Sequence, residues 1–533
     1  MKSKSRIYLK IRIAVVLTFL ITSNCYAQQT ISDKLVLPEQ QENHWWVGII
    51  NQGDLMPIAD GYQSNMYGNN YGNQIQPLLI SANGDYIWSE HPLSVKYQGD
   101  SLMVESMGGK LVYNNEEMNL KAAYLNASKK FFPPSGKLPD LDLVRFPQYN
   151  TWIELMYDQN QEDILKYAKA IVENGFPPGV IMIDDNWQED YGNWNFHPDR
   201  FANPKMMMDS LHKMGFKVML WICPFVSPDS RIHRSLAEKN ALLKDSSGRA
   251  AMIRWWNGTS SCLDFSNPAG YKWFNDQLKN LVNTYGADGF KFDAGDAKRY
   301  NDIFSYKPIG PNEHSRLFGL FGLDFPLNEY RAMWKMGGQP LVQRLRDKGH
   351  DWRDLHQLIP HILLQGIMGY PFTCPDMIGG GQFRSFLNSR TIDQELIVRS
   401  AQSHALMPMM QFSVAPWRVL DEKHLEACKL AVEIRQNYLD RILQLTKSSA
   451  QTGEPVVRSL EYVFPHQGYE KVEDQFMLGN KVLVCPMLEK GKTGRTIVLP
   501  KGRWRSDTGK TYKGPTQVKT EVPLHRLPVF EKL

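Results

Sequence analysis

The chain has 533 residues and a mass of 61.3 kDa, with 42% hydrophobic and 22% charged residues. This composition excludes disordered, collagen-like and coiled-coil proteins, and the length allows several domains with a large packed core. Five of the 61 basic residues precede residue 28, where no acidic residue occurs, so the rest of the chain balances its 56 acidic residues. A formally neutral remainder indicates no polybasic surface for nucleic acid or membrane.

The first 27 residues are typical of a secretory signal peptide. Basic residues come first, the apolar run 13–21 follows, and Cys25 and Ala27 supply small residues at an expected cleavage site. The run is too short to span a bilayer. We therefore expect residues 1–27 to be removed and the protein to be exported to the periplasm or beyond, with no membrane span. A membrane anchor, or a lipoprotein attached through Cys25, is the weaker alternative.

The cysteine pattern gives no sign of a disulfide framework or a metal site. An odd number of cysteines remains after the expected cleavage, and none forms a C-x-x-C pair. The residues are Cys223, Cys262, Cys374, Cys428 and Cys485.

Residues 28–147 predict an N-terminal β-sandwich. Short apolar runs at 45–50, 75–80 and 101–104 alternate with turns rich in Gly, Asn and Asp. Strand-rich segments of this kind return at the other end of the chain, where residues 456–533 predict a second, small β-sandwich.

Residues 148–455 change to alternating strands and helices. Buried strands are expected at 180–183, 216–222 and 289–293, and an amphipathic helix at 163–174. A helix from Pro268 to Gly286 and later strand–helix units continue the pattern. Such repeats predict a (β/α)8 barrel in the α/β class. A doubly wound nucleotide-binding sheet is disfavoured because no Gly-rich loop follows the first strand.

Carboxylates and tryptophans follow the predicted barrel strands, at the end where catalytic residues of such barrels lie. No nucleophilic Ser and no His occurs at these strand ends, and paired carboxylates with indole rings suit glycoside chemistry. Each residue alone has a structural alternative, since an Asp can cap a helix and a Trp can belong to the core. The residues are Asp184, Asp185, Trp221, Asp293, Asp296 and Asp376.

Several segments, in the right order, resemble glycoside hydrolase family 31. Phe290-Lys-Phe-Asp-Ala-Gly-Asp296 resembles its nucleophile strand, and Asp184 to Trp221 its second and third barrel strands. Cys262-Leu-Asp-Phe-Ser-Asn-Pro268 and the strands after Gln475 resemble further family segments. The resemblance implies a retaining, exo-acting α-glycosidase that uses no cofactor and acts on an oligosaccharide or other glycoside. The oligomeric state is not assigned.

The resemblance implies roles for the two catalytic carboxylates. Asp293 corresponds to the nucleophile, and Lys291, two residues earlier on the same strand face, is expected to point into its pocket and help keep it ionised. Asp347, followed five residues later by Trp352, has the spacing of the acid/base. The usual G-D-N sequence is absent there, so Asp351 and Asp376 remain competitors; Asp376 also matches a support position at the next strand end.

Further residues are expected to bind substrate, and two departures bear on the sugar. An Asp stands at the position of Cys223 in many α-glucosidases of the family, and a usual histidine is replaced near residues 411–413. Together with the Lys-Phe-Asp-Ala-Gly-Asp sequence, these features favour the branch that contains bacterial α-galactosidases and the animal myogenesis-regulating glycosidase. The other expected substrate-binding residues are Asp184, Trp187, Trp221, Trp256, Lys291, Arg344 and Asp376.

Alternatives to an α-galactosidase remain open. An α-glucosidase or an α-xylosidase would use the same residues. A carbohydrate-binding protein without catalysis would explain the altered surroundings of Asp347. A transglycosidase or lyase would share the covalent intermediate.

Overall fold

The computed structural model describes residues 29–30, 32–38, 43–99, 101–387 and 392–533. The expected signal peptide, residues 1–27, lies outside the described residues. Within the described ranges, no helix has both the length and the apolar character that crossing a bilayer requires.

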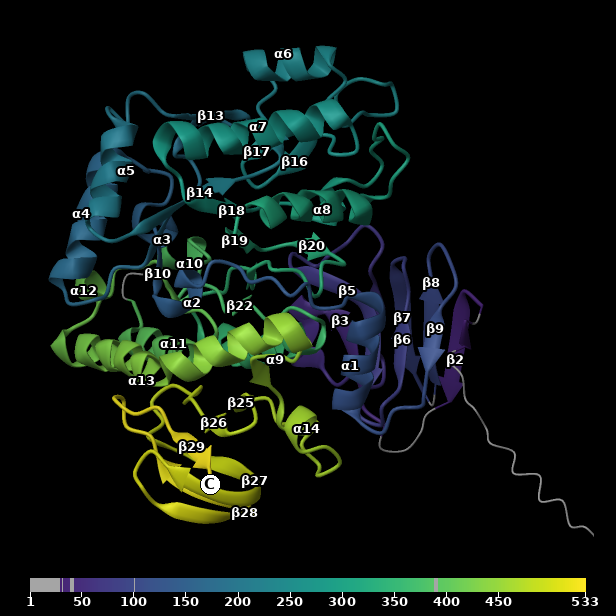
Figure 1. Cartoon of the computed structure of the whole chain (residues 1–533), viewed down its shortest axis with the longest axis vertical. Coiled ribbons are helices and arrows are strands. Elements are labelled where there is room, and N and C mark those ends of the chain that lie inside the picture. The colour runs from purple at the N-terminus through teal and green to yellow at the C-terminus, as the bar shows by residue number, and fades with distance from the viewer. Residues whose placement is uncertain (1–28, 31, 39–42, 100, 388–391) are drawn as a thin grey trace, which may run out of the picture.

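A closed parallel barrel occupies the centre of the molecule (Figure 1). Every neighbouring pair in its eight-stranded sheet, counted over the described residues, is parallel. A parallel bridge between Met377 and Gln411 joins the two edges and closes the barrel. The predicted (β/α)8 fold is therefore confirmed. In sheet order the strands are β22 (Thr373–Cys374), β21 (Gln343–Arg344), β19 (Leu327–Tyr330), β18 (Gly289–Phe292), β14 (Lys217–Ile222), β11 (Val180–Ile183), β10 (Gln148–Asn150) and β23 (Gln411–Phe412).

The helices around the barrel begin and end at ordinary capping residues. Asn160 accepts a hydrogen bond from the Asp163 amide at the start of α4, and α7 begins at Pro268 and ends at Gly286, whose φ of 80° is left-handed. Both lie within two residues of the helices expected from the sequence. The longer helices of this region are α4 (Gln161–Glu173), α5 (Pro204–Lys213), α6 (Arg231–Glu238), α7 (Pro268–Tyr285), α8 (Pro311–Gly319), α9 (Trp352–Ile367), α11 (Gln394–Ala405) and α13 (Glu422–Thr452).

The N-terminal region forms two sheets, as the sequence predicts. One contains β1 (Gln29–Thr30), β9 (Val112–Asn114), β6 (Tyr86–Trp88), β5 (Gln74–Ser81) and β3 (Trp45–Ile49), and the other contains β2 (Lys34–Pro38), β8 (Ser101–Ser106), β7 (Leu93–Gln98) and β4 (Gln63–Asn65). The first sheet continues into the barrel region, because β20 (Met333–Trp334) pairs in parallel with β5. The short η1 (Ile50–Leu55) also packs on the barrel, since a Cβ on Gly53 would lie 2.7 Å from the Cα of His361 in α9.

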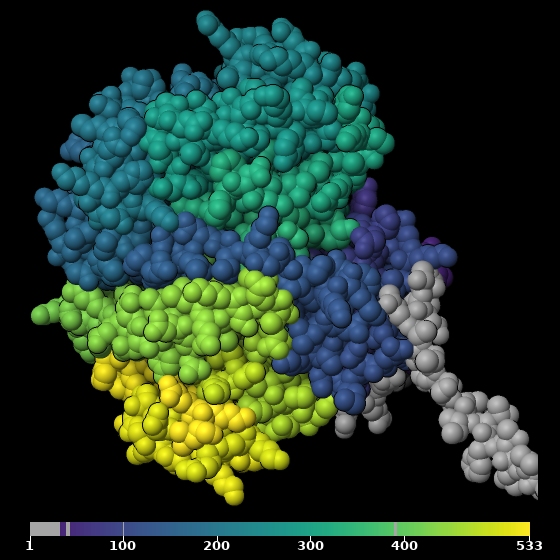
Figure 2. Space-filling model, in the orientation of Figure 1, coloured from purple at the N-terminus to yellow at the C-terminus, as the bar shows by residue number. Residues whose placement is uncertain are grey.

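The C-terminal domain is a small β structure. Its strands form one six-stranded sheet within residues 392–533, in the order β24 (Val457–Arg458), β25 (Phe476–Leu478), β26 (Val482–Val484), β29 (Val529–Lys532), β27 (Gly494–Ser506) and β28 (Thr511–Glu521). Arg399 of α11 donates a 2.9 Å hydrogen bond to the carbonyl of Val522, which fixes this domain to the barrel. In Figure 2 the yellow C-terminal residues border the green barrel residues, and blue N-terminal residues pack against the barrel beside them.

Candidate active site

A cavity of about 360 Å³ opens at the carboxyl ends of the barrel strands. Its wall includes Asp184 after β11, Trp221 in β14, Lys291 and Asp293 of the β18 segment, and Asp347 after β21. Four strand ends or following turns that are distant in sequence therefore converge on one space, as the barrel predicts.

Asp293 lies in the cavity wall between two donors. Arg331 Nε donates a 2.8 Å hydrogen bond to its Oδ1, and Trp221 Nε1 donates one of 3.1 Å to its Oδ2. Burial opposes ionisation of Asp293, but the positive charges of Arg331, Lys291 and Arg344 outweigh it and hold its pKa below the usual range. The result is a carboxylate that is oriented and ionised at neutral pH.

Lys291 forms a buried ion pair beside Asp293. Its Nζ lies 2.5 Å from Asp184 Oδ2, and the two side chains are only 4% and 3% exposed. Lys291 therefore points into the cavity as expected. Its direct partner is Asp184, and it acts on Asp293 through its charge rather than through a hydrogen bond.

Arg344 is buried and forms ion pairs with three carboxylates. Its Nη1 lies 2.7 Å from Asp347 Oδ1 and 2.8 Å from Asp376 Oδ1, and its Nε lies 3.2 Å from Glu329 Oε1. Its side chain is 1% exposed and is not part of the cavity wall. The expected direct contact of Arg344 with substrate is thus not seen; instead it orients Asp347.

The three acid/base candidates occupy different environments. Asp347 is 36% exposed and lines the cavity. Asp376 is fully buried, and burial raises its pKa to about 7. It accepts hydrogen bonds from the amides of Lys348 and Gly381, so it supports the loop rather than facing the cavity. Asp351 caps α9 through the Asp354 amide. Asp347 is therefore the candidate with access to a bound substrate.

Comparison with known protein families agrees with this geometry. The family model for the glycosyl hydrolases family 31 TIM-barrel domain matches residues 146–445, and the model for the C-terminal domain of that family matches residues 453–532. The chain belongs to glycosyl hydrolase family 31.

Curated relatives and solved structures of family 31 cover much of the chain. It is 33% identical to the myogenesis-regulating glycosidase of Mus musculus over 75% of this chain and 57% of the relative. It is 24% identical to alpha-glucosidase 2 of Bacillus thermoamyloliquefaciens over 70% of this chain and 51% of the relative. The chain thus spans a little over half the length of these relatives. A GH31 dextranase of Flavobacterium johnsoniae complexed with glucose shares the fold, with a TM-score of 0.81 and 19% identity over 95% of this chain and 67% of that chain.

Aromatic side chains form one side of this family 31 cavity. Trp152, Tyr157 and Phe383 line it and contact one another edge to face, with ring centroids 5.2 to 5.9 Å apart. Trp256 is 44% exposed at the cavity, and the Arg331 guanidinium lies 5.4 Å from its ring centroid. Flat rings in the wall of a polar cavity suit stacking against sugar faces.

Besides Arg344 and Asp376, two further residues expected at the cavity lie elsewhere. Trp187 is fully buried, donates a 2.8 Å hydrogen bond to the carbonyl of Trp221, and packs on Phe196. Cys223 follows β14 but is also fully buried and absent from the cavity wall. Neither contacts the cavity in this structure, because both side chains are enclosed in the core behind the strand end.

Sequence reasoning missed several residues of the wall. Arg331 follows β19, whose sequence Leu-Asn-Glu-Tyr carries no apolar strand pattern. Asp185 follows β11, but the sequence indicates no role for it. Burial, and then the charge of Asp184, raise its pKa to about 7, and Asn257 Nδ2 donates to it at 2.5 Å. The remaining missed residues are Tyr71, Gly72, Trp152, Tyr157, Lys298, Arg299, Arg346, Gln382, Phe383 and Arg384.

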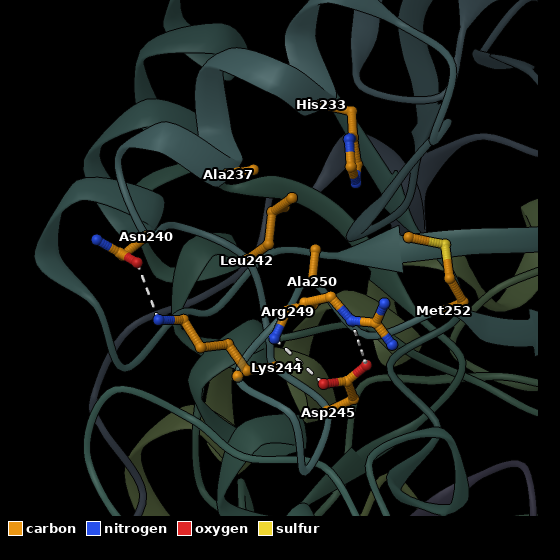
Figure 3. A pocket seen from close by; sticks show the side chains of 10 residues that line it. His233, Ala237, Asn240, Leu242, Lys244, Asp245, Arg249, Ala250 and Met252 are labelled. Carbon is orange, nitrogen blue, oxygen red and sulfur yellow. Dashed lines mark hydrogen bonds and ion pairs between the residues drawn. The ribbon is translucent and has the colours of Figure 1, made fainter.

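A larger cavity of about 580 Å³ lies apart from this site, beside α6 (Figure 3). Lys244 donates to Asn240 at 2.9 Å, and Arg249 pairs with Asp245. Its charged groups already have partners, and it lacks the paired strand-end carboxylates of the family 31 site. No group of three or more His, Cys, Asp or Glu that could hold a metal occurs among the described residues.

Proposed function

We propose that this protein is a retaining, exo-acting α-glycosidase that removes terminal α-linked galactose. The observation that carries the proposal is the pair of carboxylates at one cavity, Asp293 held ionised by Arg331 and Asp347 oriented by Arg344. The chain matches only part of its curated relatives, so the activity rests on this geometry together with family membership.

The proposed reaction has two steps. Asp293 attacks the anomeric carbon while Asp347 donates a proton to the departing glycosidic oxygen, which gives a covalent glycosyl-Asp293 intermediate. Water, losing its proton to Asp347, then releases the sugar with its configuration retained. Retention requires the carboxyl groups to lie about 5–5.5 Å apart when substrate is bound.

The surroundings of the carboxylates suit this division of roles. Asp293 carries three neighbouring positive charges, which favours the ionised nucleophile. Asp347 shares Arg344 with Asp376 and Glu329, and its partial exposure gives it access to the leaving oxygen and to water. The buried Asp184–Lys291 pair places an acceptor and a donor where sugar hydroxyls would bind.

The choice of galactose as the proposed sugar rests in part on the replacement of one acidic residue by Cys223. Cys223 replaces an acid of many α-glucosidases, and the structure encloses it away from the cavity, so no hydroxyl acceptor is supplied there. The relative with 33% identity is named a glycosidase without a stated sugar. α-Glucosidase and α-xylosidase activities are therefore the direct competitors in the test.

The test is initial-rate measurement on 4-nitrophenyl α-galactoside, α-glucoside and α-xyloside. Wild type should turn over the galactoside fastest, and Asp293→Ala and Asp347→Ala should lose activity. Asp351→Asn is the matched control, because Asn also caps a helix and residue 351 does not line the cavity. It should retain wild-type rates.

The products separate the remaining alternatives. Proton NMR of the first-formed sugar should show the α-anomer, and the β-anomer would contradict retention. Preference for another sugar would correct the substrate. Binding of free sugar without turnover of any glycoside would indicate a carbohydrate-binding protein, and transfer products or an unsaturated product would indicate a transglycosidase or lyase.

We also propose export through the N-terminal segment. Expression of the full chain and of a chain lacking residues 2–27, followed by cell fractionation, tests this. The full chain should leave the cytoplasm and begin at residue 28, whereas the shortened chain should stay inside.

A further inference from the structure

A buried chain of polar groups begins at the residue next to Asp347. Lys348 is 4% exposed, and its Nζ lies 2.7 Å from Nδ1 of His361 in α9. His361 is 1% exposed, and its Nε2 lies 3.0 Å from Oδ1 of Asp54 in η1. Gln357 Nε2 donates a 2.7 Å hydrogen bond to the other oxygen of Asp54. The loop after β21 is thereby connected to the N-terminal region.

The donor and the acceptor in each hydrogen bond from Lys348 through His361 to Asp54 are fixed at neutral pH. Burial, and then the charge of Lys348, lower the pKa of His361 to about 4, so its ring is neutral. Burial, and then the charge of Arg346, lower the pKa of Lys348 to about 8, so the lysine is still charged. A charged lysine only donates, so His361 Nδ1 accepts and Nε2–H donates to Asp54.

The backbone of Lys348 closes a ring that contains Asp347. The Lys348 amide donates a 2.7 Å hydrogen bond to Asp376 Oδ2. Asp376 Oδ1 accepts from Arg344 Nη1, which also donates to Asp347 Oδ1. A shift of the Lys348 backbone would therefore move Asp376 and Arg344, and with them the Asp347 carboxylate.

Stability alone is a weak reason for this arrangement. Burying a lysine and a histidine costs solvation, and apolar side chains of similar size would fill the same space at no such cost. The directed hydrogen bonds from Lys348 to Asp54 hold the loop after β21 in one position. A fixed position is needed where a carboxylate must lie within hydrogen-bond distance of a leaving oxygen.

We propose that Lys348, through His361 and Asp54, is a positioning residue for the general acid Asp347. This inference rests on the proposed glycosidase function. Lys348 does not line the cavity. Lys348 acts instead by fixing the position of the Asp347 carboxylate when the glycosidic bond breaks.

The test compares two substrates whose leaving phenols differ in acidity and therefore in their need for a proton. 4-Nitrophenyl α-galactoside has a good leaving group and needs little acid assistance, whereas phenyl α-galactoside needs more. Lys348→Met should lower kcat/KM on the phenyl glycoside by about 100-fold, within the usual contribution of a general acid, and on the nitrophenyl glycoside by less than about 10-fold. The loss should lie in kcat rather than KM.

Two further variants keep the test decisive. Asp54→Asn retains a hydrogen-bond acceptor but removes the charge at the far end of the chain, and should show the same leaving-group dependence at smaller size. Lys217→Met is the control. It removes a lysine at the start of β14, at the opposite end of the strand from the cavity, and should leave the ratio of the two rates unchanged. If Lys348→Met fails to fold, the Asp54→Asn ratio decides.

The outcomes separate this inference from the function beneath it. Equal losses on both substrates in Lys348→Met and Asp54→Asn, or no loss on either, would overturn the positioning role while wild-type turnover still supports the glycosidase. Wild type that hydrolyses neither these galactosides nor the matching glucosides and xylosides would overturn both.

Discussion

Among the positive charges near the proposed nucleophile Asp293, Arg331 contributes most to keeping it ionised, and replacement of Arg331 by Gln tests that contribution. The guanidinium contacts Asp293 at 2.8 Å and Asp296 at 2.6 Å, and all three side chains are mostly buried. Gln can still donate a hydrogen bond but carries no charge. We therefore expect the pKa of Asp293 to rise in Arg331→Gln.

The size of the rise follows from the geometry. Opposite unit charges about 4 Å apart attract by about 4 kcal/mol at an effective dielectric constant of about 20, which equals about 3 pKa units. Lys291 and Arg344 remain in the variant and continue to favour the anion. A rise of about 1–3 units, the usual effect of one Arg beside an Asp, is the expected result.

The assay is the pH dependence of kcat/KM on the aryl α-glycoside that wild type hydrolyses. Its acid limb reports the free enzyme's essential carboxylate, so the limb should move to higher pH by about 1–3 units. Arg331→Gln also leaves Asp296 buried without its partner, and Arg331→Gln/Asp296→Asn removes that stranded charge. Arg346→Gln, another cavity arginine but not a partner of Asp293, is the control. An unchanged acid limb in both Arg331 variants, with folding intact, would refute the electrostatic role.

Three other outcomes are expected. Lys291→Met should cost about 3–5 kcal/mol in urea unfolding because it leaves Asp184 buried and unpaired, and Lys291→Met/Asp184→Asn should recover most of that loss; additive losses would contradict the pair. His404 is buried, and burial, then Arg435, lower its pKa to about 3, so below pH 6.5 the unfolded chain binds a proton that the folded chain does not. From pH 7.5 to pH 5, the free energy of unfolding should therefore fall by about 2 kcal/mol less in His404→Leu than in wild type, as measured by urea unfolding. Equal decreases in the two proteins would refute this. Trp256→Ala should raise KM about fivefold on an aryl glycoside, as loss of one stacking contact of about 1 kcal/mol predicts, with little change in kcat.

The sequence predicts the barrel where its strands are apolar. Residues 180–183, 216–222 and 289–293 read as buried strands, and the structure has β11, β14 and β18 there. The polar strands β10, β19 and β23 gave no such signal. Their side chains satisfy one another inside the barrel, since Gln411 Nε2 donates to Gln148 Oε1 and to Glu329 Oε2 at 2.7 Å each. Periodicity cannot identify a strand whose polar residues are buried by pairing across the barrel.

The same limit explains which residues of the cavity can be predicted from the sequence. Asp184 and Asp293 are predicted both by their place after apolar strands and by family motifs, whereas Lys291 and Asp347 are predicted by the motifs; all four line the cavity. Arg331 follows a strand without an apolar pattern, and its role depends on contacts that only the fold creates. Trp187 is expected at the cavity from the sequence, yet its side chain is buried in the core and donates to the Trp221 carbonyl.

The parallel pairing of β20 with β5 has a consequence for dividing the chain. The turn before β5 and the first residue of β5 also contact the cavity arginine, since Arg331 Nη1 donates to the Gly72 carbonyl at 2.7 Å and Gln74 Nε2 donates to the Arg331 carbonyl at 2.6 Å. A fragment that starts at residue 148 would keep every barrel strand and both carboxylates. It would nevertheless lack the backbone that orients the nucleophile's counter-ion. The smallest fragment with the proposed activity is thus expected to be longer than the barrel. Separately expressed N-terminal and barrel fragments should show that activity only when they are mixed.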